Sequence, residues 1–133
     1  MKAVIDTNVF VSGIFWKGPP HEILKAWRKG KFQMVLSAEI LTEYRRVLHA
    51  LNADRLLVDV DELLEIVVSK SVIVQPAKFK SPVCRDADDD KFLEAAKSGK
   101  VKYLVSGDKA LLEIREFSGA TILPPKPFLD LLK

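Results

Sequence analysis

The 133-residue chain has one cysteine, Cys84, so it can form no internal disulfide and no cysteine-rich zinc site. Such sparing use of cysteine is typical of a reducing compartment, and we expect a cytoplasmic protein. No apolar run approaches the roughly 20 residues that span a bilayer. Asp6 interrupts the N-terminal segment where a signal peptide would be apolar, so no membrane contact is expected.

Aromatic residues are also scarce, at 8%, although hydrophobic residues make up 48% of the chain. We therefore expect a globular protein with a mainly aliphatic core rather than a disordered chain. The net charge of +3 is small, so it permits an anionic partner such as RNA without requiring one. The length favours a single domain over residues 1–133.

Short apolar runs alternate along the chain with segments in which apolar residues recur at helical spacing. The runs predict buried strands at residues 2–5, 32–36, 72–74, 102–106 and 120–123. The helical segments cover residues 19–30, 38–50, 60–70, a stretch from 88 or 89 to 99, a short helix at 111–114, and 128–132. This alternation is typical of an α/β fold whose parallel sheet is covered by helices on both faces.

Acidic residues stand where the predicted strands end. Asp6 directly follows the first strand, and Asp108 follows the fourth. In a parallel sheet the functional crevice lies beyond the carboxyl ends of the strands, so both side chains are expected in it if the two strands are neighbours. A further run of acids, within residues 86–90, begins the helix that precedes the fourth strand.

Helical spacing distinguishes among these acids. Asp89 lies three, four and seven positions before apolar residues and shares their face, whereas Asp90 is expected to point toward solvent. Asp90 stays open as an alternative third acid. Glu43 falls at the border of the apolar stripe of its own helix, roughly 90° from the centre at ~100° per residue. Each acid also has a purely structural interpretation, as a turn, cap or surface residue.

A shared crevice would give these carboxylates a common chemistry. Without basic partners they would repel one another and their pKa values would rise, and no basic residue stands at matching strand ends. A divalent cation resolves this conflict, and ligands that are all oxygen suit Mg²⁺ or Mn²⁺. Such an ion can polarise a phosphate and lower the pKa of bound water, which is the chemistry of phosphodiester hydrolysis.

Four segments resemble those of the PIN-domain ribonucleases, in the same order and over nearly the whole chain. They are AVIDTNVFVSG, LSAEILTEYRRVL, CRDADDDKFLEAA and YLVSGDKALL. The chain is most similar to the prokaryotic branch of toxins from toxin–antitoxin systems. The resemblance implies a three-layer α/β/α fold with a central parallel sheet, and a metal-dependent endoribonuclease that uses one or two Mg²⁺ or Mn²⁺ ions.

The resemblance also assigns roles by position. The catalytic and metal-binding acids it implies are Asp6, Glu43, Asp89 and Asp108, with Asp86 as a further metal ligand. The polar residues expected around them are Thr7, Asn8 and Ser106, the last standing where many relatives carry Thr. It implies an RNA substrate, a homodimer and, for a toxin, a cognate antitoxin. Three arginines that flank the acidic segments are candidate contacts to RNA phosphates: Arg45, Arg46 and Arg85.

Other functions fit the residues less well. A phosphatase of the haloacid-dehalogenase type needs a second Asp two residues after the first, where this chain has Asn8. A response-regulator receiver needs an Asp after the third strand, which here ends in Val74-Gln75-Pro76. The remaining alternative is a catalytically weak domain that serves as a scaffold for RNA or protein.

Overall fold

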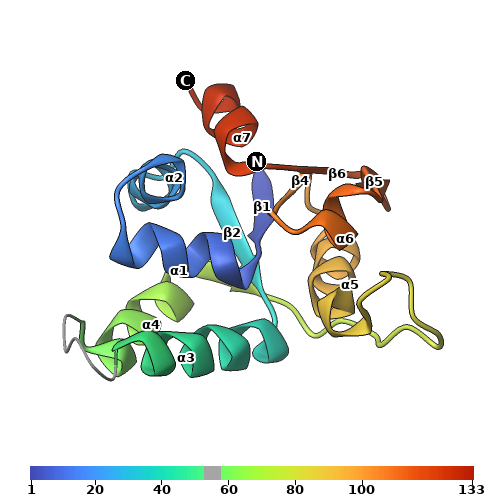
Figure 1. Cartoon of the computed structure of the whole chain (residues 1–133), viewed down its shortest axis with the longest axis horizontal. Coiled ribbons are helices and arrows are strands. Elements are labelled where there is room, and N and C mark those ends of the chain that lie inside the picture. The colour runs from blue at the N-terminus through green and yellow to red at the C-terminus, as the bar shows by residue number, and fades with distance from the viewer. Residues whose placement is uncertain (53–57) are drawn as a thin grey trace.

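A six-stranded sheet runs through the molecule, with helices on both of its faces (Figure 1). The structure is a computed structural model that describes residues 1–52 and 58–133. The strands, in chain order, are β1 (Lys2–Ile5), β2 (Gln33–Leu36), β3 (Ser71–Ile73), β4 (Tyr103–Val105), β5 (Glu116–Phe117) and β6 (Ala120–Leu123). Their order across the sheet is β3-β2-β1-β4-β6-β5, and only the β5–β6 pair is antiparallel.

The strand order reverses at β1. The chain first builds outward from β1 to β2 and β3, then returns to place β4 on the opposite side of β1 and continues to β6. Ile5, the last residue of β1, is paired with Val105, the last residue of β4. The residues that follow these two strands therefore emerge side by side, at the switch point where open α/β sheets place their ligands.

Helices occupy both sides of the central strands, which confirms the predicted three-layer α/β/α fold around a mainly parallel sheet. The helices are α1 (Thr7–Phe15), α2 (Pro19–Arg28), α3 (Ala38–Asn52), α4 (Val60–Ser69), α5 (Asp90–Gly99), α6 (Lys109–Leu112) and α7 (Pro125–Leu131). Helix α5 packs against β1, β2 and β4, and α1 and α2 lie on the opposite side (Figure 1). A turn of 3₁₀ helix, Ala87–Asp89, leads into α5.

Two elements were not predicted from the sequence. Helix α1 has the sequence TNVFVSGIF, which lacks a polar face, so no amphipathic period marks it as a helix. Strand β5 is two residues long, too short for a recognisable alternation. The predicted strands and helices are all present; β1 and β6 have the predicted ends, and the ends of the others lie within three residues of those predicted.

The core is mainly aliphatic, as expected, and it also fixes the helices that carry acidic residues. The ring of Tyr44 on α3 stacks on Phe10 of α1, with 4.2 Å between the ring centroids. The Tyr44 hydroxyl donates a hydrogen bond to the carbonyl oxygen of Ile5, at the end of β1. Because Tyr44 is fully buried, this contact ties the first half of α3 to the end of the central strand.

Within the described residues, no helix is both long enough and apolar enough to cross a lipid bilayer.

Candidate active site

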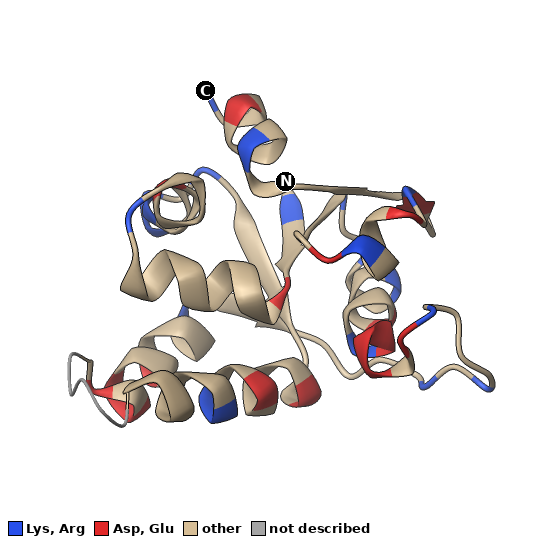
Figure 2. Ribbon diagram, viewed as in Figure 1, with Lys and Arg blue, Asp and Glu red and all other residues tan. Residues whose placement is uncertain are grey.

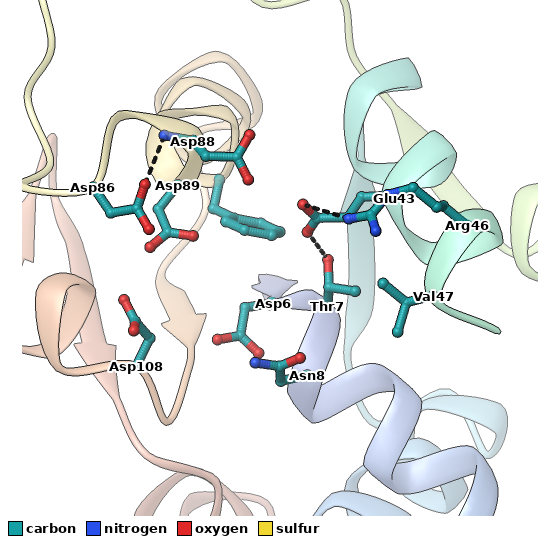
Figure 3. A pocket seen from close by; sticks show the side chains of 11 residues that line it. Asp6, Thr7, Asn8, Glu43, Arg46, Val47, Asp86, Asp88, Asp89 and Asp108 are labelled. Atoms are coloured by element: carbon teal, nitrogen blue, oxygen red, sulfur yellow. Dashed lines mark hydrogen bonds and ion pairs between the residues drawn. The ribbon is translucent and has the colours of Figure 1, made fainter. Parts of the chain in front are cut away.

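A pocket of about 230 Å³ opens beyond the ends of β1 and β4. Along the ribbon, acidic residues stand directly after β1, shortly after β4, on α3 and at the start of α5 (Figure 2). Its wall holds six acidic side chains: Asp6, Glu43, Asp86, Asp88, Asp89 and Asp108 (Figure 3). The structure thus brings together all five acids that the sequence singled out, and it adds Asp88.

Asp6 stands at the junction of β1 and α1 and is only 4% exposed. One carboxylate oxygen, Oδ1, accepts a hydrogen bond of 2.9 Å from the Val9 amide and so caps the N-terminus of α1. The other oxygen, Oδ2, accepts a hydrogen bond from Ser106 Oγ. The structural role as a cap and a role in the pocket are therefore compatible, because each uses a different part of the carboxylate.

Ser106 links the two strand ends. It is fully buried, and while it donates to Asp6 its Oγ accepts a 2.9 Å hydrogen bond from the Asp108 amide. Asp108 in turn caps α6 through a 3.3 Å bond from the Leu111 amide to Oδ2. Thus a single hydroxyl sets the spacing between the acids that follow β1 and β4.

Asp89 and Asp90 are neighbours with different environments. Asp89 lines the pocket together with Asp108, and its side chain accepts no capping hydrogen bond. Asp90 faces away from the pocket, and its carboxylate accepts bonds of 3.1 and 2.7 Å from the amides of Val83 and Cys84. The prediction that Asp90 points to solvent is wrong, since it is 8% exposed and anchors the preceding loop.

Two of the pocket acids, Asp6 and Asp89, have pKa values above the ordinary value for an aspartate. The pKa of Asp6 rises from 3.8 to about 6, chiefly because the group is buried and further because Asp108 and Glu43 lie near. The pKa of Asp89 rises to about 7, again chiefly through burial and further through the neighbouring carboxylate of Asp108. The pocket therefore disfavours its own negative charge and would bind a cation readily.

Glu43 has partners that the sequence analysis missed. Lys91, in the first turn of α5, places its Nζ 2.7 Å from Glu43 Oε1. Thr7 Oγ1 donates to the other oxygen, Oε2, and Arg46 lies 3.9 Å from Oε1. The expectation that the acids lack a basic partner is therefore wrong for Glu43. Lys91 directly follows Asp90 at the end of the acidic run, which places a basic residue near the acids but does not identify Glu43 as its partner.

The three predicted arginines lie in different places. Arg46 lines the pocket, with 71% of its side chain exposed. Arg45 pairs with Asp61 of α4 at 3.0 Å, outside the pocket, and Arg85 pairs with Glu113 at 3.2 Å. Only Arg46 thus adjoins the acids directly. Among the predicted polar residues, Thr7 and Asn8 line the pocket, and Ser106 lies beneath it.

The pocket has the donor chemistry for a metal ion, although its side chains do not yet converge. Six carboxylates offer oxygen ligands only, which fit Mg²⁺ or Mn²⁺ rather than zinc. Over residues 1–52 and 58–133, however, no three His, Cys, Asp or Glu side chains form a group that could already hold an ion. The carboxylates surround the space, so binding a cation would require them to rotate inward.

Comparisons with known proteins agree with this architecture. The chain is 34% identical over 120 residues to MJ1680, an uncharacterised protein of Methanocaldococcus jannaschii, and the alignment covers 87% of this chain and 76% of that one. Its fold resembles the crystal structure of PAE2754 from Pyrobaculum aerophilum, with a TM-score of 0.60 and 17% identity, over 99% of this chain and 89% of the other. The profile of the PIN domain matches residues 2–110, which include every acid of the pocket. The chain therefore belongs to the PIN-domain family, whose members are generally nucleases.

Proposed function

We propose that this protein is a metal-dependent endoribonuclease. The observation that carries the proposal is the pocket at the switch point, which is lined by acids that follow β1 and β4 and by acids at the start of α5. Four of these acids, Asp6, Asp86, Asp89 and Asp108, form no ion pair with a described residue. Burial and neighbouring carboxylates raise the pKa values of Asp6 and Asp89, as expected for such a group of acids without a cation.

In this proposal Asp6, Asp89 and Asp108 hold the ion, and Asp86 adds a carboxylate at the rim. A bound Mg²⁺ or Mn²⁺ would neutralise charge on a phosphate and lower the pKa of a water molecule. The chain itself contributes orientation, because Ser106 fixes Asp6 relative to the Asp108 backbone. Arg46, largely exposed at the wall of the pocket, offers a guanidinium to a neighbouring phosphate of the RNA.

We further propose that the protein is the toxin of a toxin–antitoxin pair and acts as a homodimer in the cytoplasm. These proposals rest on the resemblance of its four motifs to that branch of the family. They predict an antitoxin gene adjacent to its own, growth arrest when the protein is produced alone, and relief when the neighbouring gene is expressed with it. Growth arrest should disappear in Asp6→Asn if the nuclease is the cause.

The nuclease proposal is tested with a panel of single-stranded and structured RNAs, incubated with Mn²⁺, Mg²⁺ or EDTA. Wild-type protein should cut at internal positions with either metal, and both EDTA and Asp6→Asn should abolish cutting. Equal cutting by the folded Asp6→Asn variant would contradict the assignment of the site. Metal binding and RNA binding without cleavage of any RNA would favour a scaffold instead.

A further inference from the structure

Lys91 lies beside the acidic pocket and forms a nearly buried ion pair with Glu43, which lines it. Its Nζ lies 2.7 Å from Glu43 Oε1 and 3.4 Å from Asp88 Oδ1. The side chains of Lys91 and Glu43 are only 11% and 12% exposed, so water screens this pair weakly. The contact joins the first turn of α5 to α3, across 48 residues of sequence.

Both carboxylate oxygens of Glu43 already have partners. Oε1 receives Lys91, and Oε2 accepts a hydrogen bond from Thr7. The guanidinium of Arg46 adds a second positive charge 3.9 Å from Oε1. To coordinate an ion directly, Glu43 would have to give up these contacts or accept a cation close to the lysine ammonium.

The opposite side of the pocket differs. Asp6, Asp86, Asp89 and Asp108 form no ion pair among the described residues. The hydrogen bonds that the carboxylates of Asp6, Asp86 and Asp108 accept come from Ser106 and from backbone amides. The pocket thus has two parts. The glutamate side is neutralised by the protein's own cations, and the aspartate side is not.

We propose that Lys91 is a positioning residue that holds Glu43 away from the metal, so that the pocket takes a single divalent ion on its aspartate side. The lysine supplies, on the glutamate side, the positive charge that a second ion would otherwise provide. This inference deepens the proposed nuclease function and rests on its metal site. It departs from the assignment of Glu43 as a metal ligand.

Mn²⁺ titration, followed by the electron paramagnetic resonance signal of the free ion, tests the inference without RNA. Wild type should bind one ion. Lys91→Met, which removes the charge but keeps an apolar stem, should bind two, because Glu43 is released to act as a ligand. Lys91→Arg, which keeps the positive charge, should bind one ion, as wild type does. The double variant Lys91→Met/Glu43→Gln should also bind one ion, because it lacks the Glu43 carboxylate. A count of one in Lys91→Met, or of two in wild type, would overturn the inference.

Arg46→Met provides the matched control. It removes an equal charge near the same carboxylate, but from a side chain that is 71% exposed, and the count should stay at one. If Lys91→Met fails to fold, Mn²⁺ binding by Glu43→Gln tests whether Glu43 is a metal ligand. Its Mn²⁺ dissociation constant should stay within about threefold of wild type, whereas Asp89→Asn should weaken binding by more than about thirtyfold. Equal losses in Glu43→Gln and Asp89→Asn would refute the inference.

The titration also separates this inference from the proposed nuclease function. One ion in wild type and two in Lys91→Met, without cleavage of any RNA, would support the role of Lys91 and contradict the nuclease. RNA cleavage accompanied by two ions in wild type would support the nuclease and overturn the inference. No Mn²⁺ binding by folded wild type would contradict both.

Discussion

Ser106 donates a hydrogen bond to Oδ2 of Asp6 across 100 residues of sequence, and both side chains are buried. This bond lowers the pKa of Asp6, against the larger effect of burial, which raises it. Ser106→Ala should therefore raise the pKa of Asp6 further, destabilise the protein by about 1–3 kcal/mol and weaken Mn²⁺ binding about tenfold.

Ser106→Thr is the matched control for Ser106→Ala, because threonine keeps the hydroxyl. Mn²⁺ affinity should stay within about threefold of wild type, even if the added methyl group lowers the melting temperature at this fully buried position. Isothermal titration and thermal unfolding of both variants measure these effects. Equal loss of affinity in the two variants would mean that packing, rather than the hydroxyl, matters.

In the absence of metal, stability should depend on pH through Asp6 and Asp89. Their pKa values in the folded protein, about 6 and about 7, lie above the ordinary value of 3.8, so the folded state binds more protons than the unfolded state between these limits. The free energy of unfolding therefore decreases as pH rises from about 4 to 7. At about 1.4 kcal/mol per pKa unit, Asp6 accounts for about 3 kcal/mol of this loss.

Comparison with Asp6→Asn isolates that contribution. Relative to wild type in EDTA, the variant should gain stability as pH rises from 4 to 8, measured by denaturant unfolding. Excess Mn²⁺ should remove most of the pH dependence in wild type, because the ion favours the charged carboxylates. A constant difference between the two proteins from pH 4 to 8 would contradict the raised pKa of Asp6.

Asp90 should matter for stability rather than for metal. Together with Glu94, whose carboxylate accepts a 2.7 Å bond from the Phe79 amide, it anchors the loop before α5. Asp90→Asn should destabilise the protein by about 1–3 kcal/mol and change Mn²⁺ affinity less than threefold. Asp89→Asn should show the reverse pattern, with apo stability kept or raised and metal binding lost.

A substitution at Gly13 tests the packing of α1, the helix that the sequence did not predict. A Cβ there would lie 2.7 Å from Leu24 Cδ1 and 2.8 Å from the Pro20 carbonyl oxygen, so α1 and α2 approach too closely for alanine. Gly13→Ala should cost about 1–3 kcal/mol of stability, measured by chemical denaturation. An unchanged or higher stability would contradict this packing of α1 against α2.

The sequence predicted the fold well because strands and amphipathic helices carry clear periods. Helix α1 was not predicted because its residues are apolar around most of its surface. A buried helix of this kind shows no periodic alternation of apolar and polar residues. Asp90 was placed wrongly for a related reason. Helical spacing showed that Asp90 lies on a different face of the helix from Asp89. The loop whose Val83 and Cys84 amides bind Asp90 has no periodic pattern from which its position could be predicted.

The acids of the pocket were found because strand ends and helix starts constrain where side chains lie. Asp6 and Asp108 could be placed from the rule that parallel strands share a carboxyl edge, on the condition that their strands are neighbours, and β1 does pair with β4. The pairing of Lys91 with Glu43 could not be derived, because it depends on how α3 and α5 lie relative to each other. That geometry is set by long-range packing, in which α5 contacts α3 and the strands β1, β2 and β4, rather than by local sequence.

The most direct test of the central claim is the rate of RNA cleavage against Mn²⁺ concentration for wild type, Asp89→Asn and Asp90→Asn. These variants make the same chemical change at adjacent positions, one facing the pocket and one facing the loop. The acidic pocket predicts saturable, metal-dependent cleavage that falls at least about 100-fold in Asp89→Asn and less than about threefold in Asp90→Asn. Equal rates in all three folded proteins, or cleavage that persists in EDTA, would contradict it.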